Sequence, residues 1–184
     1  MIRKLLIITF LFGTVAVTYA QKKDKKKKSD KNNTEQSVSD TAKIDYKAIG
    51  APMPPIYAHT LDGEKLTEKS FTKGGNLLVM LFNPTCDHCQ TVTQTLEENI
   101  DKFKKTEIIL MASGSLVNYL EFFNNVTRHS DYPKIKVGAD SANFIGKTFV
   151  YGSLPQINIY DKDRKLVKTF MGETSIEALK PYID

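Results

Sequence analysis

Two cysteines separated by two residues are the side chains of this sequence best suited to chemistry. Cys86 and Cys89 are the only cysteines in 184 residues. Sulfurs at this spacing can exchange disulfides with a partner, because the first attacks and the second resolves the mixed disulfide. At the start of a helix, unpaired N–H groups and the positive end of the helix dipole favour a thiolate. We therefore expect Cys86 to be the more exposed and more acidic sulfur, and a redox-active Cys86–Cys89 disulfide with no other cofactor.

Two other interpretations of the pair stay open, a zinc site and a purely structural disulfide. With only two cysteines, a zinc site with three or four thiolate ligands is excluded within one chain. A site with two thiolates and two imidazoles would need two of the three histidines, none of which are paired at the spacing of a zinc finger: His59, His88 and His129. The pattern favours redox chemistry over both alternatives, and no metal is expected.

A buried strand and an amphipathic helix are predicted to position the two sulfurs. Leu77 to Phe82 is an unbroken apolar run, typical of a strand covered on both faces in a parallel or mixed sheet. Asn83 and Pro84 predict a sharp turn after it. Beyond Cys86, apolar residues recur at helical spacing, namely Val92, Leu96, Ile100 and Phe103. Both sulfurs are thus expected where the strand ends and the helix begins.

The rest of the folded part alternates strands and helices. Two short strands over 56–60 and 65–66 are predicted to join at the turn of Asp62 and Gly63. The other predicted elements are strands over 107–112, 134–137, 156–160 and 166–170, and helices over 67–71, 115–126, 141–149 and 174–183. The aromatic residues of the helix over 115–126 are expected in the core. This order predicts an α/β sandwich around a central mixed β-sheet.

The first 45 residues differ from the rest. Residues 1–20 have two basic residues, an uncharged apolar stretch and small residues at the end, the pattern of a secretory signal peptide. An uncleaved membrane anchor is the alternative. Residues 21–45 hold eight lysines and five acidic residues with almost no apolar residue, the composition of a disordered linker. We therefore expect an exported protein, periplasmic or anchored, with one folded domain over 46–184.

The net charge of +5 comes from these N-terminal segments. Of the 26 basic residues, two lie in 1–20 and eight in 21–45, which leaves 16 in the folded part. Of the 21 acidic residues, five lie in 21–45, which also leaves 16. The folded part is formally neutral, so a nucleic-acid partner is not expected.

Four stretches of the folded part form a pattern. They are Gly50-Ala51-Pro52-Met53-Pro54, the turn Leu61-Asp62-Gly63-Glu64, the apolar strand with Cys86-Asp87-His88-Cys89, and Leu154-Pro155 before a strand. Over 49–184 this pattern resembles the thioredoxin superfamily, and within it the exported TlpA/ResA-like thiol-disulfide oxidoreductases of the redoxin branch. The resemblance implies a thioredoxin-like three-layer sandwich with an added N-terminal β-hairpin, and an enzyme that acts on protein cysteines or disulfides.

The resemblance also implies a proline loop at the site. Pro155 would pack against the cysteine pair, and the backbone of Leu154 would pair with an extended substrate peptide. Pro84 and Asp87 are assigned to the same substrate-binding surface. Sequence alone gives no isomer for the bond before Pro155, and an ordinary proline at the start of a strand is the alternative. A membrane electron donor or acceptor would renew the cysteine pair, while the oligomeric state stays open.

The sequence departs from the family at its usual proton acceptors and at a tryptophan. Thioredoxins carry a buried acid where Met80 stands, and the ResA-like branch carries a glutamate where Val92 stands. The tryptophan usual near the motif is absent. His88 is the expected tuner, because a partly protonated imidazole stabilises the Cys86 thiolate and so the reduced form. Asp87 opposes this effect, and a merely exposed His88 is the alternative.

Three functions follow, in decreasing order of fit. The first is an exported thiol-disulfide oxidoreductase, favoured as a reductase although its direction stays open. The second is a redox-silent thioredoxin-fold binding module, suggested by the missing acids and tryptophan. The third is copper handling as in SCO-like proteins, which use a wider cysteine spacing and a distant histidine. Peroxide reduction fits less well, because peroxiredoxins carry a threonine where Asn83 stands.

Overall fold

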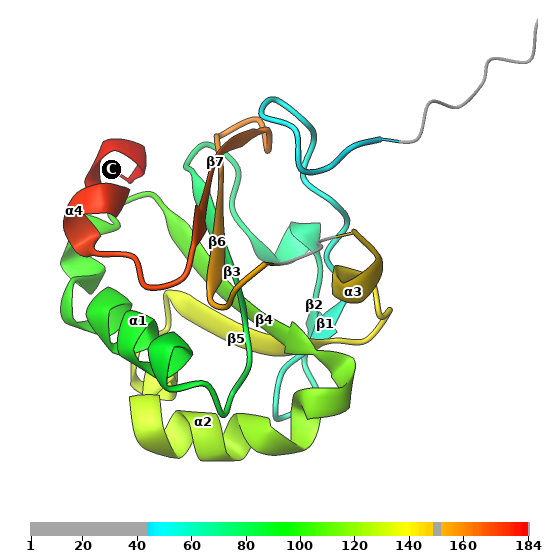
Figure 1. The fold of residues 1–184 in the computed structure, drawn as a ribbon, viewed down its shortest axis with the longest axis vertical. Helices are drawn as coiled ribbons and strands as arrows, with labels where there is room; N and C mark the ends of the chain where they lie inside the picture. The colour runs from blue at the N-terminus through cyan, green and yellow to red at the C-terminus, as the bar shows by residue number, and fades with distance from the viewer. Residues whose placement is uncertain (1–43, 149–151, 184) are drawn as a thin grey trace, which may run out of the picture. The chain divides into compact units, whose positions relative to one another are not determined.

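A mixed sheet of seven strands forms the middle layer of the domain (Figure 1). The computed structural model describes residues 44–148 and 152–183. The strands are β1 (Ala58–His59), β2 (Lys65–Leu66), β3 (Leu77–Phe82), β4 (Glu107–Ser113), β5 (Ile135–Asp140), β6 (Gln156–Tyr160) and β7 (Leu166–Met171). They lie in the order β2-β1-β5-β4-β3-β6-β7, with β3, β4 and β5 parallel and the remaining pairs antiparallel.

Helices cover the two faces of this sheet unequally. Three helices pack on one face, as Figure 1 shows: α1 (Asp87–Glu98), α2 (Leu120–Thr127) and α4 (Ile176–Leu179). The short α3 (Ile145–Thr148) and the segment before β3 cover the other face. Each face has its own hydrophobic core, so the predicted three-layer sandwich is confirmed.

The central strand β3 shows why its sequence has no polar alternation. All six of its residues are buried, because alternate side chains enter different cores. Met80 faces the layer of α1, whereas Val79 and Leu81 face the layer of α3. A strand buried on both faces needs apolar residues throughout, so its bounds were predictable to the residue.

The predicted helices over 115–126, 141–149 and 174–183 are shorter in the structure. The first begins as a 3₁₀ helix, Gly114–Tyr119, and becomes α-helical only in α2. A 3₁₀ helix has three residues per turn, so the side chains before α2 point in other directions than an α-helix would give them. Phe123 is buried, whereas Tyr119 and Phe122 are 49% and 47% exposed. The prediction that all three aromatics belong to the core was therefore wrong for two.

α3 begins four residues later than predicted, and α4 begins two residues later and covers only four residues. The predicted helix over 67–71 is also reduced. It is a single 3₁₀ turn, Glu68–Ser70, with Thr67 and Ser70 forming a reciprocal capping box. The C-terminal helix consists of α4 and the 3₁₀ turn Lys180–Tyr182, which contains a proline. The last residue predicted for the helix over 141–149 lies outside the described residues.

The expectations for the N-terminal segments lie largely outside the described residues, and that for the N-terminal hairpin is not tested. The signal peptide over 1–20 and all of the linker over 21–45 except Ile44 and Asp45 lie outside the described residues. Within 44–148 and 152–183, no helix is long and apolar enough to cross a membrane. β1 and β2 pair antiparallel, and their identity with the added hairpin of the ResA-like branch stays a prediction.

A buried carboxyl group stands out in the packing of α1. Glu97 is only 6% exposed, and its Oε1 has no hydrogen-bond partner among the described residues. Burial raises the pKa of Glu97 to about 7, and the negative charges of Asp131 and Glu98 add to the rise. The folded protein thus holds a proton on Glu97 at pH values where an unfolded chain would have released it.

We predict that Glu97→Gln stabilises the protein at high pH. The folded-state pKa exceeds the ordinary value of 4.5, so Glu97 costs stability as the pH rises from 4.5 through about 7. The substitution should raise the free energy of unfolding by roughly 1 to 3 kcal/mol at pH 8 and by little at pH 4. Urea unfolding at both pH values measures this. Glu98→Gln, on the exposed side of the helix, is the matched control; an equal gain there would contradict the prediction.

Candidate active site

The cysteine pair lies where β3 ends and α1 begins. Cys86 is the residue that precedes the first turn of α1, with an extended backbone (φ −90°, ψ 117°) and a half-buried side chain. Cys89 has 0% exposed surface and belongs to the core beneath α1. Both are free thiols. The two sulfurs thus differ in access to solvent although they are one helical turn apart.

A hydrogen-bonded turn holds Cys86 in place. Asn83 Oδ1 accepts hydrogen bonds from the backbone N–H and the hydroxyl of Thr85, each at 3.0 Å. The backbone N–H of Cys86 donates to the carbonyl of Asn83 at 3.1 Å. Gln90 Nε2 donates to the carbonyl of Pro84 at 3.0 Å, which ties the turn to the helix. The stretch that lacks the family's tryptophan therefore forms a side-chain-closed turn before the reactive sulfur.

Burial divides the roles of the sulfurs. It raises the pKa of the Cys89 thiol far above its usual range, and a hydrogen bond between Cys89 and Cys86 raises it further. The backbone around Asn83 opposes this only in part. Cys89 therefore keeps its proton and shares it with the sulfur of Cys86. The half-exposed Cys86 is the sulfur that can reach a partner.

An ion pair that sequence reasoning missed lies beside the motif. His88 Nδ1 contacts the carboxylate of Glu173, in the loop between β7 and α4. Both side chains are mostly exposed. The hydrogen bond to Glu173 raises the pKa of His88, its charge adds to this, and Asp87 contributes a smaller rise. Because 85 residues separate the two partners, only the folded chain brings them together.

The proline loop lies at the same end of the sheet. The Leu154–Pro155 peptide bond is cis. Pro155 is buried and Leu154 half-buried, and β6 starts with the next residue, which pairs with Leu81 of β3. A groove of about 190 Å³ opens beside the turn, lined by Leu81, Phe82, Asn83, Met111, Ser113, Leu116, Ile145 and Leu154. The loop and the turn before Cys86 therefore border one groove.

The remaining predicted site residues are placed differently. Asp87 is exposed in the first turn of α1 and makes no part of this groove. Pro84 is buried, and its carbonyl accepts the bond from Gln90. Direct contact with a substrate is therefore easier for Asp87 than for the Pro84 ring.

Neither position at which the resemblance implied a proton acceptor carries an acid. Met80 and Val92 are both buried in the apolar core that contains Cys89. The buried Glu97 lies eight residues after Cys89 on the same helix, about 12 Å along its axis. Across 44–148 and 152–183, no three His, Cys, Asp or Glu side chains lie close enough to hold a metal ion. A proton leaving Cys89 therefore has Cys86 as its nearest acceptor.

Proteins of similar sequence include thiol-disulfide oxidoreductases. No protein-family model matches the chain. The thiol-disulfide oxidoreductase ResA of Bacillus cereus is 26% identical over 135 residues, which cover 73% of this chain and 76% of ResA. ResA of Bacillus anthracis matches to the same extent.

Solved structures support the fold. StoA of Bacillus subtilis matches with a TM-score of 0.55 and 15% identity, over 72% of this chain and 98% of StoA. The thioredoxin domain of a thiol-disulfide oxidoreductase from Bacteroides vulgatus matches with a TM-score of 0.55 and 19% identity, over 73% and 94% of the two chains. The resemblance predicted from the sequence is confirmed: the chain is an oxidoreductase of thioredoxin-like fold, similar in sequence to the thiol-disulfide oxidoreductases named ResA.

Proposed function

We propose that this chain is an exported thiol-disulfide oxidoreductase that exchanges disulfides with the cysteines of partner proteins. The observation that carries the proposal is the asymmetric pair, with a half-exposed Cys86 at the helix start and a buried Cys89 hydrogen-bonded to it. The name of its ResA relatives supports the same activity. Export is supported by the signal-like residues 1–20, with a periplasmic or membrane-anchored location.

The exchange proceeds in two balanced steps. The Cys86 thiolate attacks one sulfur of the partner's disulfide, forms a mixed disulfide and releases the other partner sulfur as a thiolate. Cys89 then loses its proton and attacks the Cys86 sulfur. This step forms the Cys86–Cys89 disulfide and releases the second partner sulfur, so two electrons pass to the partner. The reverse order oxidises a partner dithiol.

The groove beside the cis proline supplies the binding surface in this proposal. Leu154 precedes Pro155, and its backbone is free to pair with an extended peptide as a sheet edge would. The apolar lining of the groove suits a partner side chain next to the reacting cysteine. Asp87 lies outside this groove, exposed in the first turn of α1, where it can offer a polar contact to the partner.

Local charge favours the reductive direction. A net positive charge near Cys86 would stabilise its thiolate and make the disulfide more oxidising. His88 supplies one positive charge when protonated, but Glu173 and Asp87 supply two negative ones. The three together do not leave a positive surplus. We therefore propose a reductase, which in an oxidising compartment requires a membrane electron donor.

A redox-silent binding module is the second candidate. It is favoured by the apolar Met80 and Val92, which leave the buried Cys89 without an acid to take its proton. Copper handling gains no support, because the described residues place no His, Asp or Glu beside the two cysteines as a third ligand. The reactivity of Cys86 distinguishes the first two candidates.

Cys89→Ala should trap the mixed disulfide. Without the resolving sulfur, Cys86 should stay bound to a disulfide-containing substrate such as insulin, and mass spectrometry of the intact adduct under non-reducing conditions detects it. Cys86→Ala is the matched control and should form no adduct, because Cys89 has no exposed surface. If Cys89→Ala reacts no faster than free glutathione, the binding module is the better description.

The reduction potential decides the direction. Equilibration of the Cys86–Cys89 pair with thiol buffers should give a value near about −270 mV for a reductase. A value near about −120 mV would contradict the reductive assignment but keep the exchange activity. His88→Ala should shift the potential to more negative values, because it removes the positive charge that the protonated imidazole places beside Cys86.

Glu173→Gln should lower the pKa of His88 toward its ordinary value of 6.5. The ion pair exists only below the pKa of His88 and is lost as the pH rises through it, so removal of the carboxylate makes the imidazolium release its proton at lower pH. Titration of the His88 ring followed by NMR measures the shift. Glu177→Gln, in the first turn of α4, is the control. An unchanged His88 titration in Glu173→Gln would refute the pairing.

A further inference from the structure

A second pocket lies at the end of the sheet opposite the cysteines. It has a volume of about 670 Å³, within the range of small-molecule sites. Three segments line it: Phe71–Gly75 before β3, Lys104–Glu107 at the start of β4, and Pro133, Lys134 and Lys136 at the start of β5. It therefore sits where three parallel strands begin, whereas the cysteines sit where β3 ends.

Positive charge is concentrated in this pocket. Its lining contains five lysines and one carboxylate, Glu107, although the folded part as a whole is formally neutral. The lysines are Lys73, Lys104, Lys105, Lys134 and Lys136. Within the described ranges, none of Lys73, Lys104, Lys134 and Lys136 forms an ion pair with a carboxylate. The pocket thus holds a surplus of cations that protein carboxylates do not neutralise.

Two of these ammonium groups are fixed. Lys134 Nζ donates to the carbonyls of Phe103 and Lys104, the latter at 3.0 Å. Lys136 Nζ donates to the carbonyl of Ser70 at 2.8 Å and lies 5.3 Å from the centre of the Phe71 ring. Each ammonium has three N–H groups, so both retain at least one for a ligand. Half-buried and anchored, they differ from freely solvated surface lysines.

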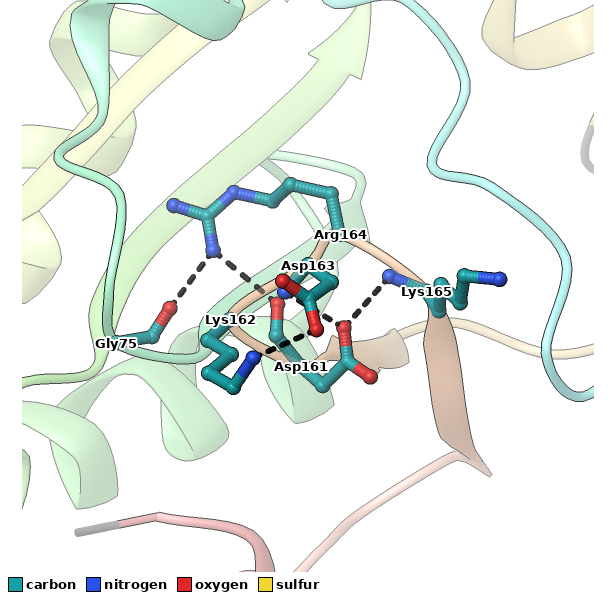
Figure 2. A network of polar contacts seen from close by, with 6 residues as sticks. All are labelled: Gly75, Asp161, Lys162, Asp163, Arg164 and Lys165. Carbon is teal, nitrogen blue, oxygen red and sulfur yellow. Dashed lines mark hydrogen bonds and ion pairs between the residues drawn. The ribbon is translucent and has the colours of Figure 1, made fainter.

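The pocket walls are held as well. A Cβ atom on Gly75 would lie 2.0 Å from the carbonyl oxygen of Lys105, so only glycine allows these two loops to approach. Arg164 donates to the carbonyl of Gly75 at 2.8 Å and to that of Thr72 at 2.6 Å. Figure 2 shows Arg164 reaching Gly75 from the turn between β6 and β7, where Asp161 accepts the N–H of Lys165. The loop before β3 is therefore preformed.

Glu107 restricts the kind of anion. Its Oε1 accepts a hydrogen bond from the Thr72 hydroxyl at 3.2 Å, while its Oε2 is buried without a partner. A ligand with only anionic oxygens would be repelled by that carboxylate. A ligand that also carries hydroxyl groups could donate one to Oε1 of Glu107, which keeps a second lone pair, and place its anionic group among the lysines.

We propose that this pocket binds the phosphate ester of a polyol, either free in solution or as a lipid headgroup. A phosphate carries more charge than a carboxylate and accepts from several ammonium groups at once. Lys134 and Lys136 provide the fixed contacts, Lys73 and Lys104 the mobile ones, and Glu107 the contact to a hydroxyl. The site is separate from the proposed redox chemistry and does not depend on it.

The test uses the full chain with glycerol 3-phosphate as the free ligand. Titration followed by calorimetry and by NMR should give saturable binding, with shifts in the amides of the three lining segments. Combined Lys134→Gln and Lys136→Gln should weaken binding by at least about tenfold. Lys73→Gln with Lys104→Gln should also weaken binding, and this variant keeps the test valid if the first does not fold. Both residues are exposed, and their side chains form no hydrogen bond or ion pair within the described residues. Combined Lys162→Gln and Lys165→Gln, at two exposed lysines outside the pocket, is the charge-matched control.

Vesicles of phosphatidylglycerol test the lipid source. The same variants are compared in the full chain, so that residues 21–45, with their eight lysines, contribute equally to vesicle binding in each of them. Loss of vesicle binding in the pocket variants but not in the combined Lys162→Gln and Lys165→Gln control would assign a lipid headgroup. An effect on glycerol 3-phosphate alone would assign a free ligand. The proposal fails if neither probe binds, or if all variants bind as tightly as the wild type. It also fails if Glu107→Gln leaves the ratio of glycerol 3-phosphate to inorganic phosphate affinity unchanged.

Discussion

Complete burial of Cys89 is the constraint on which the site depends. The apolar strand β3 gives α1 a surface to pack on, and Val92 and Leu96 bring the first turn of the helix down onto it. That packing removes Cys89 from water and raises the pKa of its thiol. Cys86 precedes the helix and keeps part of its surface. The hydrophobic contact that stabilises the fold therefore also leaves Cys86 accessible to a partner and shields Cys89 from it.

The same burial creates a difficulty for the second step of exchange. Cys89 must lose its proton to attack, yet Met80 and Val92 offer no acceptor in the surrounding core. The hydrogen bond to Cys86 points the proton toward the half-exposed sulfur of Cys86. When Cys86 is tied up in a mixed disulfide, the proton must leave on that side, where the turn of Asn83 and the solvent lie. Resolution would then be slow unless the partner's departing thiolate accepts the proton.

How far the sequence could predict this site varies from residue to residue. β3 was predictable because six consecutive apolar residues fit only a doubly covered strand. The 3₁₀ start of the predicted helix over 115–126 was not predictable. Over a single turn, the spacing of apolar residues does not distinguish a 3₁₀ helix, with three residues per turn, from an α-helix with 3.6. The cis bond before Pro155 and the contact of His88 with Glu173 depend on the folded chain, because neither has a local sequence pattern.

The two ends of the parallel strands carry different functional groups: lysines line the pocket where the strands begin, and the cysteine pair follows the end of β3. Six residues of β3 span roughly 20 Å, so no small ligand can touch both the lysine pocket and Cys86. A phosphate bound where β3, β4 and β5 begin would leave the cysteine end facing away from whatever carries that phosphate. On a lipid surface this geometry would present Cys86 and its groove to soluble partners, and membrane docking and disulfide exchange could then proceed without competing for the same face.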